Sequence, residues 1–86
     1  MTRNTKQRGK AGAAIESIAG LRVGMTLYSR TELDSSGYPV KVKITSIKTW
    51  KREPNRVEVH YKYGLYQYGY LSGYDLRFWS LEQESI

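Results

Sequence analysis

The chain has 86 residues, 14 basic and 8 acidic side chains, a net charge of +6 and no cysteine. This length allows one small domain, and the lack of cysteine excludes disulfides, thiolate metal sites and a cysteine nucleophile. With one histidine, no apolar run of membrane-spanning length and no recognisable signal peptide, the sequence predicts a soluble cytoplasmic protein without cofactor, metal ion, small-molecule substrate or membrane partner.

The first twelve residues, MTRNTKQRGKAG, are basic and lack acidic side chains. After Met1 they also lack large apolar side chains, so the segment buries too little surface to offset the entropy of ordering it. We therefore predict a flexible basic tail over residues 1–12, which either solubilises the chain or adds nonspecific contacts to phosphates. Its cations are Arg3, Lys6, Arg8 and Lys10.

Residues 13–20, AAIESIAG, have the pattern of a short helix. Ile15 and Ile18 fall on one helical face, and Gly20 stands where a helix would end. Because so short a helix is marginal in water, we expect it to dock on the rest of the domain. At the other end of the chain, the acidic residues 82–86 are expected to fray.

After the expected helix, the apolar period changes to two. Residues 23–27 alternate as a half-buried strand does, and the turn formers of residues 32–39 follow them. Apolar residues and lysines then alternate over residues 40–47, with a change of phase at 45–46 that predicts a bulge. The sequence KREPN, residues 51–55, predicts the next turn because proline cannot donate to a strand ladder.

Five of the eight tyrosines lie in VEVHYKYGLYQYGYL, residues 57–71. The parity of the aromatic positions changes at Gly64–Leu65, which predicts a two-residue hairpin loop with Gly64 at positive φ. Such a loop pairs Tyr63 with Tyr66 and Tyr61 with Tyr68, and it places all the rings on the apolar face of the hairpin. A tight turn or a 3₁₀ turn at residues 72–75 and a last short strand at residues 76–79 complete the pattern.

Five short strands separated by turns, without crossover helices, indicate an all-β fold. The arrangement that best fits residues 21–81 is a small five-stranded antiparallel SH3-like barrel, preceded by the short helix and the tail.

The motifs Val23–Gly24, VEVHYKYGL at residues 57–65 and DLR at residues 75–77 resemble those of Tudor-type SH3-like barrels. The resemblance covers about residues 21–79 and implies the barrel fold. Lys62 stands where the family has an acid and Leu65 where it has Asn, so the resemblance does not imply recognition of methylated arginine. A partial aromatic enclosure for a cation remains an alternative; its members would be Tyr38, Tyr61 and Tyr63.

The excess of basic residues, interleaved with aromatic ones, predicts that the chain binds DNA or RNA. Trp50 stands among cations in one expected loop, a combination that supplies charge for phosphates and a ring for a base; a tryptophan buried in the core is the alternative. Lysines on strands also commonly serve only to prevent sheets from pairing edge to edge with other chains. The predicted nucleic-acid-binding residues are Arg3, Lys6, Arg8, Lys10, Lys41, Lys43, Lys48, Trp50, Lys51, Arg52, Arg56 and Lys62.

Three tyrosines near the Gly64 turn have two interpretations. Tyr63, Tyr66 and Tyr68 either fill the core, which the small size of the barrel slightly favours, or form an exposed aromatic platform on which bases stack.

No arrangement of residues indicates catalysis. His60 falls on a polar strand face, and the spacing of the acids and serines supports neither a triad nor a carboxylate pair. The glycines match neither a Walker loop nor a dinucleotide-binding motif. The alternative to nucleic-acid binding is therefore a small phage or mobile-element adaptor or inhibitor that binds a host protein through exposed tyrosines.

Overall fold

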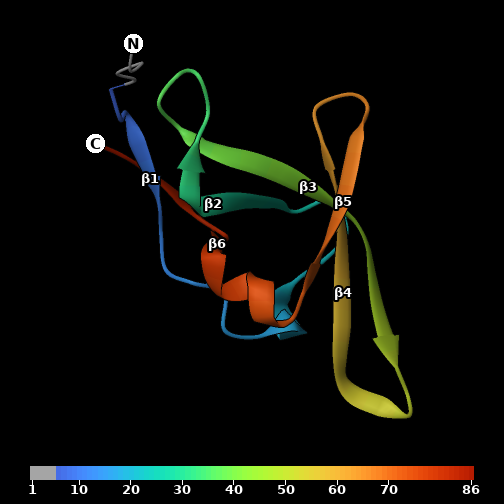
Figure 1. Ribbon diagram of the computed structural model, residues 1–86. Helices are drawn as coiled ribbons and strands as arrows, with labels where there is room; N and C mark the ends of the chain where they lie inside the picture. The colour runs from blue at the N-terminus through green and yellow to red at the C-terminus, as the bar shows by residue number, and fades with distance from the viewer. Residues whose placement is uncertain (1–5) are drawn as a thin grey trace.

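The computed structural model describes residues 6–86, and these form an all-β structure (Figure 1). Its helical segments are two short 3₁₀ helices, η1 and η2. Among the described residues, no helix has the length and apolar character needed to cross a membrane. In chain order the elements are β1 (Gly9–Ala11), η1 (Ile18–Gly20), β2 (Thr26–Leu33), β3 (Pro39–Trp50), β4 (Glu53–Tyr63), β5 (Gln67–Ser72), η2 (Tyr74–Phe78), β6 (Trp79–Ser80) and β7 (Gln83–Ser85).

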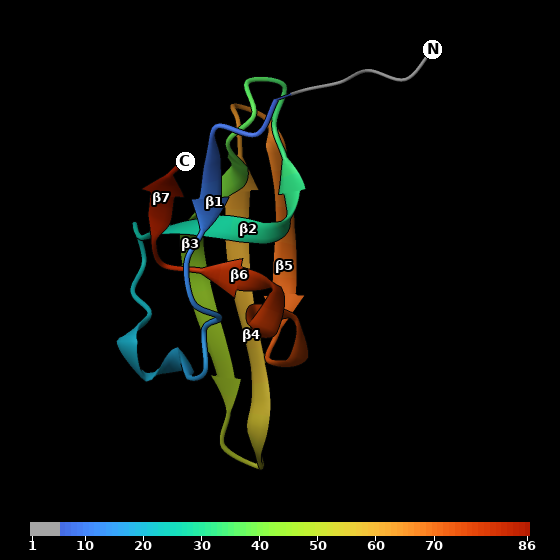
Figure 2. The same ribbon diagram turned by 90° about the vertical axis from the view of Figure 1, so that its left-hand side faces the viewer.

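The strands form two antiparallel sheets. The larger has the strand order β5-β4-β3-β2-β6, and the smaller pairs β1 with β7 (Figure 2). The loops that join β2 to β3 and β4 to β5 lie at one end of the molecule, whereas the tip of the β3–β4 hairpin lies at the other (Figures 1 and 2). The two ends therefore present separate surfaces.

The inner face of the five-stranded sheet supplies most of the core. Leu27 on β2 pairs with Val42 on β3, and Ile44 and Val59 continue this apolar face on β3 and β4. The alternation of apolar residues and lysines on β3 is the cause, since successive side chains of a strand point to opposite faces. The residues that complete the buried cluster from the other segments are Ile15, Leu21, Leu71 and Leu76.

Two irregularities bend the β3–β4 ladder. One register shift lies between Ile44 and Ser46, which confirms the predicted bulge. The second lies between Thr49 and Trp50, where Trp50 pairs with Glu53 and the turn shortens to two residues. Pro54 therefore belongs to β4 rather than to the expected turn at residues 51–55. The register shift leaves it without a ladder partner, so its missing N–H costs no hydrogen bond.

The helix expected at residues 13–20 does not form. Only Ile18–Gly20 is helical, as one 3₁₀ turn in which the N–H of Ala19 donates to Ser17 Oγ at 3.1 Å. The residues before it are not helical: Ala14 forms an isolated bridge with Ser80, and the N–H of Ile15 donates to the Trp79 carbonyl at 3.0 Å. So short a helix is marginal by itself, whereas the observed conformation buries Ile15 and pairs its backbone.

The tail and the C-terminus also differ from the prediction. Residues 9–11 are not a free tail, because β1 pairs with β7 and places Lys10 opposite Glu84. The C-terminal residues 83–85 are correspondingly a strand rather than a frayed end. The N–H of Arg8 donates to the Gly37 carbonyl at 2.8 Å, so hydrogen bonds to two distant segments offset the entropy of ordering these residues. Arg3 and the other residues before Lys6 lie outside the described part of the chain.

The expected last strand is also shorter than predicted. Leu76 and Phe78 belong to η2, and only Trp79 and Ser80 form β6. Asp75 stabilises the start of η2, since its Oδ2 accepts hydrogen bonds from the N–H and the hydroxyl of Ser72, both at 3.0 Å.

Candidate functional site

The loop between β4 and β5 decides where the tyrosines point. It contains three residues, Gly64 to Tyr66, and Gly64 has the expected positive φ, 66°. Tyr63 therefore pairs with Gln67, rather than with Tyr66 as predicted. Because side chains alternate along a strand, one added loop residue moves every later side chain to the other face. The rings are thus not all on the apolar face.

The register of β3, β4 and β5 places a set of basic and aromatic side chains on the outer face of the sheet. Lys43 pairs with Lys62, and Lys62 pairs with Tyr68. Lys41 and Tyr70 lie two residues along β3 and β5, respectively, and so point to the same side. We call these five residues the basic–aromatic face: Lys41, Lys43, Lys62, Tyr68 and Tyr70.

The two rings of this face are exposed but supported from one side. Tyr68 and Tyr70 are 69% and 60% exposed, so the core interpretation of Tyr68 is wrong. The Lys62 ammonium lies 6.0 Å from the centre of the Tyr68 ring. The His60 ring stacks on Tyr70 with centroids 5.6 Å apart and an interplanar angle of 28°. These cross-strand contacts hold the rings in place while much of each ring remains open to solvent.

The lysines of the face are not neutralised by neighbours. None of the ion pairs found among residues 6–86 involves Lys41, Lys43 or Lys62. Lys43 and Lys62 are directly opposite each other on neighbouring strands, an arrangement of like charges that destabilises a sheet. An anion bound at this point would relieve the repulsion.

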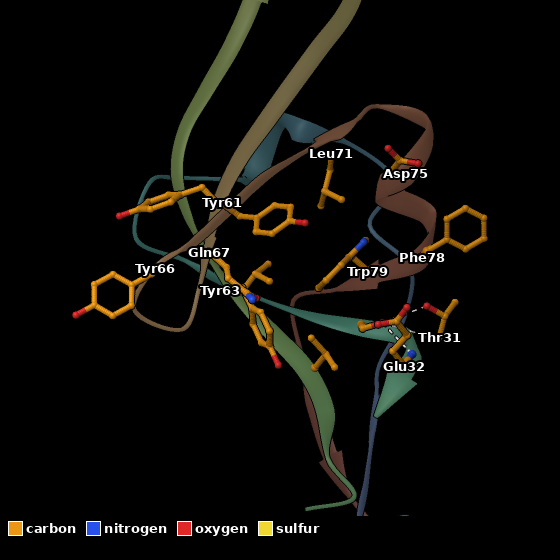
Figure 3. Close-up of a pocket in the computed structure, with 14 residues that line it drawn as sticks. Thr31, Glu32, Tyr61, Tyr63, Tyr66, Gln67, Leu71, Asp75, Phe78 and Trp79 are labelled. Carbon is orange, nitrogen blue, oxygen red and sulfur yellow. Dashed lines mark hydrogen bonds between the residues drawn. The ribbon is translucent and has the colours of Figure 1, made fainter. Parts of the chain in front are cut away.

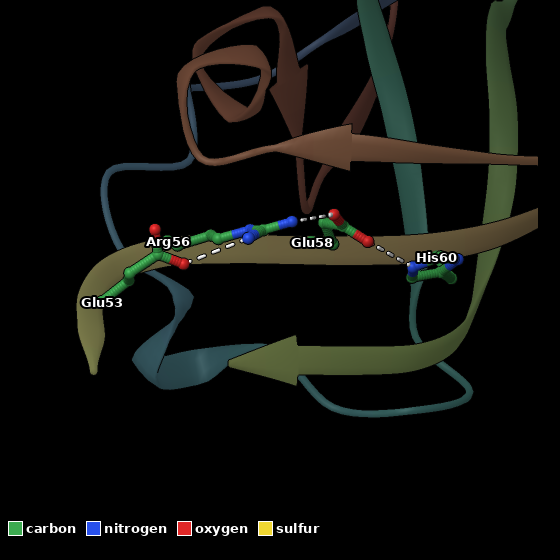
Figure 4. Close-up of polar contacts among 4 residues, drawn as sticks. All are labelled: Glu53, Arg56, Glu58 and His60. Carbon is green, nitrogen blue, oxygen red and sulfur yellow. Dashed lines mark hydrogen bonds and ion pairs between the residues drawn. The ribbon is translucent and has the colours of Figure 1, made fainter. Parts of the chain in front are cut away.

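Arg56, a predicted cation beside Trp50, lies outside this face and is paired with two glutamates (Figure 4). The Arg56 guanidinium lies 4.0 Å from the centre of the Trp50 ring. It also contacts Glu53 at 3.0 Å and Glu58 at 3.7 Å, and Glu58 contacts His60 at 3.0 Å. Trp50 is half-buried at the tip of the β3–β4 hairpin, far from the Gly64 loop (Figure 1).

The remaining predicted cations do not belong to the basic–aromatic face. Lys48 lies opposite Glu58 on the β3–β4 ladder, and Lys51 and Arg52 are exposed in the hairpin turn. Lys10 forms a 3.7 Å ion pair with Glu84. Of the predicted nucleic-acid-binding residues that the structure describes, Lys41, Lys43 and Lys62 share one face, whereas Trp50, Lys51, Arg52 and Arg56 lie together around the tip of the β3–β4 hairpin.

A groove of about 900 Å³ opens on the other face of the sheet (Figure 3). Its charged lining residues are both acids, Glu32 on β2 and Asp75 on η2. Within it the rings of Tyr61 and Trp79 lie 6.2 Å apart at 37°. Six aromatic residues line this aromatic groove: Tyr61, Tyr63, Tyr66, Tyr68, Phe78 and Trp79.

The predicted aromatic platform is thereby divided between two surfaces. Tyr63 and Tyr66 line the groove and are 41% and 87% exposed, so neither fills the core. Tyr68 also contributes to the lining of the groove, although its pairing with Lys62 directs its side chain to the outer face. Tyr38 is not among the lining residues and lies against Gly9 instead, so it does not join Tyr61 and Tyr63 in an enclosure.

No family model, curated protein or solved structure matches this chain. Among residues 6–86, no group of three or more His, Asp or Glu side chains is placed to hold a metal ion.

Sequence reasoning missed several residues of both surfaces. Tyr70 of the outer face escaped it because a two-residue loop was assumed, and a three-residue loop would have placed Tyr68 and Tyr70 beside the lysines. His60 was expected on the polar face, but its contact with Tyr70 was not. Glu32, Asp75 and Trp79 meet in the groove although they are far apart in the sequence. No local pattern indicates that meeting.

Proposed function

We propose that this chain is a non-enzymatic nucleic-acid-binding module that acts through the basic–aromatic face. The observation that carries the proposal is the Lys43–Lys62 pair, two unneutralised cations held side by side next to an exposed ring. Phosphates are the anions that such a row suits, because they repeat along a chain and release counterions when lysines neutralise them. A cytoplasmic location is part of the same proposal.

Other exposed cations add nonspecific contacts in this proposal. Lys6 and Arg8 precede β1, and Lys51 and Arg52 form the hairpin turn. They lie outside the basic–aromatic face, so they would strengthen binding without directing it. Lys10 and Arg56 contribute less because each is engaged by a glutamate.

A salt series tests this function. If three lysines neutralise three phosphates, the affinity for an oligonucleotide falls about 20- to 40-fold between about 50 and 200 mM salt. Fluorescence anisotropy with a labelled oligonucleotide measures this fall. Absence of binding at about 50 mM salt, or an affinity that salt does not change, would refute the proposal.

We also propose that the five-stranded sheet is an SH3-like barrel of the Tudor type. The strand order β5-β4-β3-β2-β6 and the short 3₁₀ helix before the last strand of the sheet support it. The sequence resemblance over residues 21–79 points the same way. In this proposal the aromatic groove is the open side of the barrel.

A second function, protein binding, is favoured by the aromatic groove. Its aromatic lining offers the kind of anchoring surface found at protein interfaces, and both of its charged residues are acids in a chain of net charge +6. By charge complementarity, the occupant we propose is an extended protein segment that carries a basic side chain. An adaptor or inhibitor from a phage or mobile element would use the groove in this way.

Substitutions in the aromatic groove test the second function. We expect Glu32→Lys and Tyr63→Ala each to weaken at least tenfold the retention of a protein partner captured after nuclease treatment and a high-salt wash. Leu65→Ala is the control, since Leu65 is 73% exposed in the β4–β5 loop and does not line the groove. Equal retention by the Glu32 and Tyr63 variants and the control would exclude the groove as the binding site.

A further inference from the structure

We infer that the basic–aromatic face takes single-stranded rather than double-stranded nucleic acid, with two successive bases stacked on Tyr68 and Tyr70. This inference rests on the proposed function and specifies its ligand. It comes from the position of the two rings on the sheet relative to the lysines.

The spacing of the two rings does not match a strand whose bases are stacked on one another. Tyr68 and Tyr70 are two residues apart on β5, which separates their attachment points by about 6.6 Å along the strand. Successive bases of a duplex strand are only about 3.4 Å apart. Two neighbouring bases can lie on the two rings only if they are pulled apart from each other, which single strands allow and a duplex resists.

Both rings are already oriented to receive a base. His60 stacks on one side of Tyr70, and the Lys62 ammonium lies over Tyr68. A side chain that is held before binding loses less conformational entropy when a ligand orders it. The high exposure of both rings leaves surface for the bases, and every base has a flat face that can stack.

The lysines fix the direction in which the bases point. Lys62 lies one strand inside the edge strand β5, and Lys43 lies one strand further in. Neighbouring strands are about 4.8 Å apart, so phosphates held by these lysines would lie over β3 and β4. The bases would then project toward β5, where the rings stand.

Comparison of three ligands of equal length tests the inference: a single-stranded thymidine oligonucleotide, the same strand without bases, and a blunt duplex. Each stacked base strengthens binding about 5- to 150-fold. We therefore expect the wild-type chain to bind the normal strand at least about 25-fold more tightly than the abasic strand, and more tightly than the duplex. The abasic strand keeps the charge, so the ratio reports the bases alone.

Variants assign that ratio to the rings. The double variant Tyr68→Ala/Tyr70→Ala should bind normal and abasic strands almost equally, whereas Tyr68→Phe/Tyr70→Phe should keep the wild-type ratio because it keeps the rings. Tyr66→Ala is the matched control: Tyr66 is an exposed tyrosine of the adjoining loop that is not on this face. It should also keep the ratio.

The outcomes separate this inference from the function on which it rests. Salt-dependent binding with equal affinity for normal and abasic strands, tighter binding of the duplex, or an unchanged ratio in the double alanine variant would overturn the stacking of bases and leave the proposed function standing. No binding to any of the three ligands at about 50 mM salt would overturn both.

Discussion

Replacing both Lys43 and Lys62 with glutamine is expected to weaken nucleic-acid binding at least about 100-fold and to stabilise the fold slightly. Each lysine lost removes a charge-assisted contact to a phosphate, worth about 1.5–3 kcal/mol. It also makes the slope of log affinity against log salt concentration shallower by about 0.7–0.9. The same change removes two like charges that face each other across the β3–β4 ladder, so the free energy of unfolding should rise by about 0.2–1 kcal/mol. Anisotropy titrations across a salt series and urea denaturation measure the two effects.

A second pair of substitutions controls for total charge. Lys51→Gln/Arg52→Gln also removes two positive charges, but from the turn at the far end of the β3–β4 hairpin. The affinity of this variant for nucleic acid should fall only a few-fold, and its free energy of unfolding should not rise. Trp50→Ala, in the same region, should also bind nucleic acid nearly as well as wild type. If the turn variants weaken binding as much as the Lys43 and Lys62 substitutions do, then binding does not depend on the basic–aromatic face.

The central strands could be predicted from the sequence because their information is local. The alternation of apolar residues and lysines on β3 follows from the two-residue period of a strand, and Val42 and Ile44 are buried for that reason. The bulge after Ile44 was likewise visible as a break in that alternation. Lys41 and Lys43 were therefore placed correctly on the polar face.

The sites depended on features that local patterns do not contain. One additional residue in the loop after Tyr63 sends Tyr68 and Tyr70 to the lysine side, and either loop length fits the glycine at position 64. The pairing of β1 with β7 joins the two ends of the chain, so neither segment alone indicates a strand. The composition of residues 1–12 predicted a tail because it reflects only the apolar surface of that segment, and not the backbone hydrogen bonds that the segment forms with distant parts of the chain.

Gly37→Ala is expected to destabilise the protein by about 2–5 kcal/mol, through backbone strain and through displacement of the N-terminal segment. Gly37 has φ of +88°, a left-handed conformation that costs other residues about 1–2 kcal/mol. A methyl group there would also overlap the Lys6 carbonyl oxygen and lie 3.2 Å from the Arg8 nitrogen. Forcing a group into such a packed site costs about 1–3 kcal/mol more. A chain of this length has about 4–13 kcal/mol of stability in total, so thermal unfolding should occur roughly 10–40 °C lower.

Gly24→Ala separates the two causes. Gly24 has a similar φ, +95°, but no atom lies within 4 Å of the position that a methyl group would take. It should therefore cost only the backbone strain, about 1–2 kcal/mol. The Gly37→Ala substitution should also be made in a chain that lacks residues 1–8. There it should cost no more than Gly24→Ala, when its free energy of unfolding is compared with that of the unsubstituted shortened chain. If the two glycine variants are equally unstable in the full chain, then the segment before β1 does not pack on the β2–β3 loop, and the flexible tail that the composition predicts is the better description.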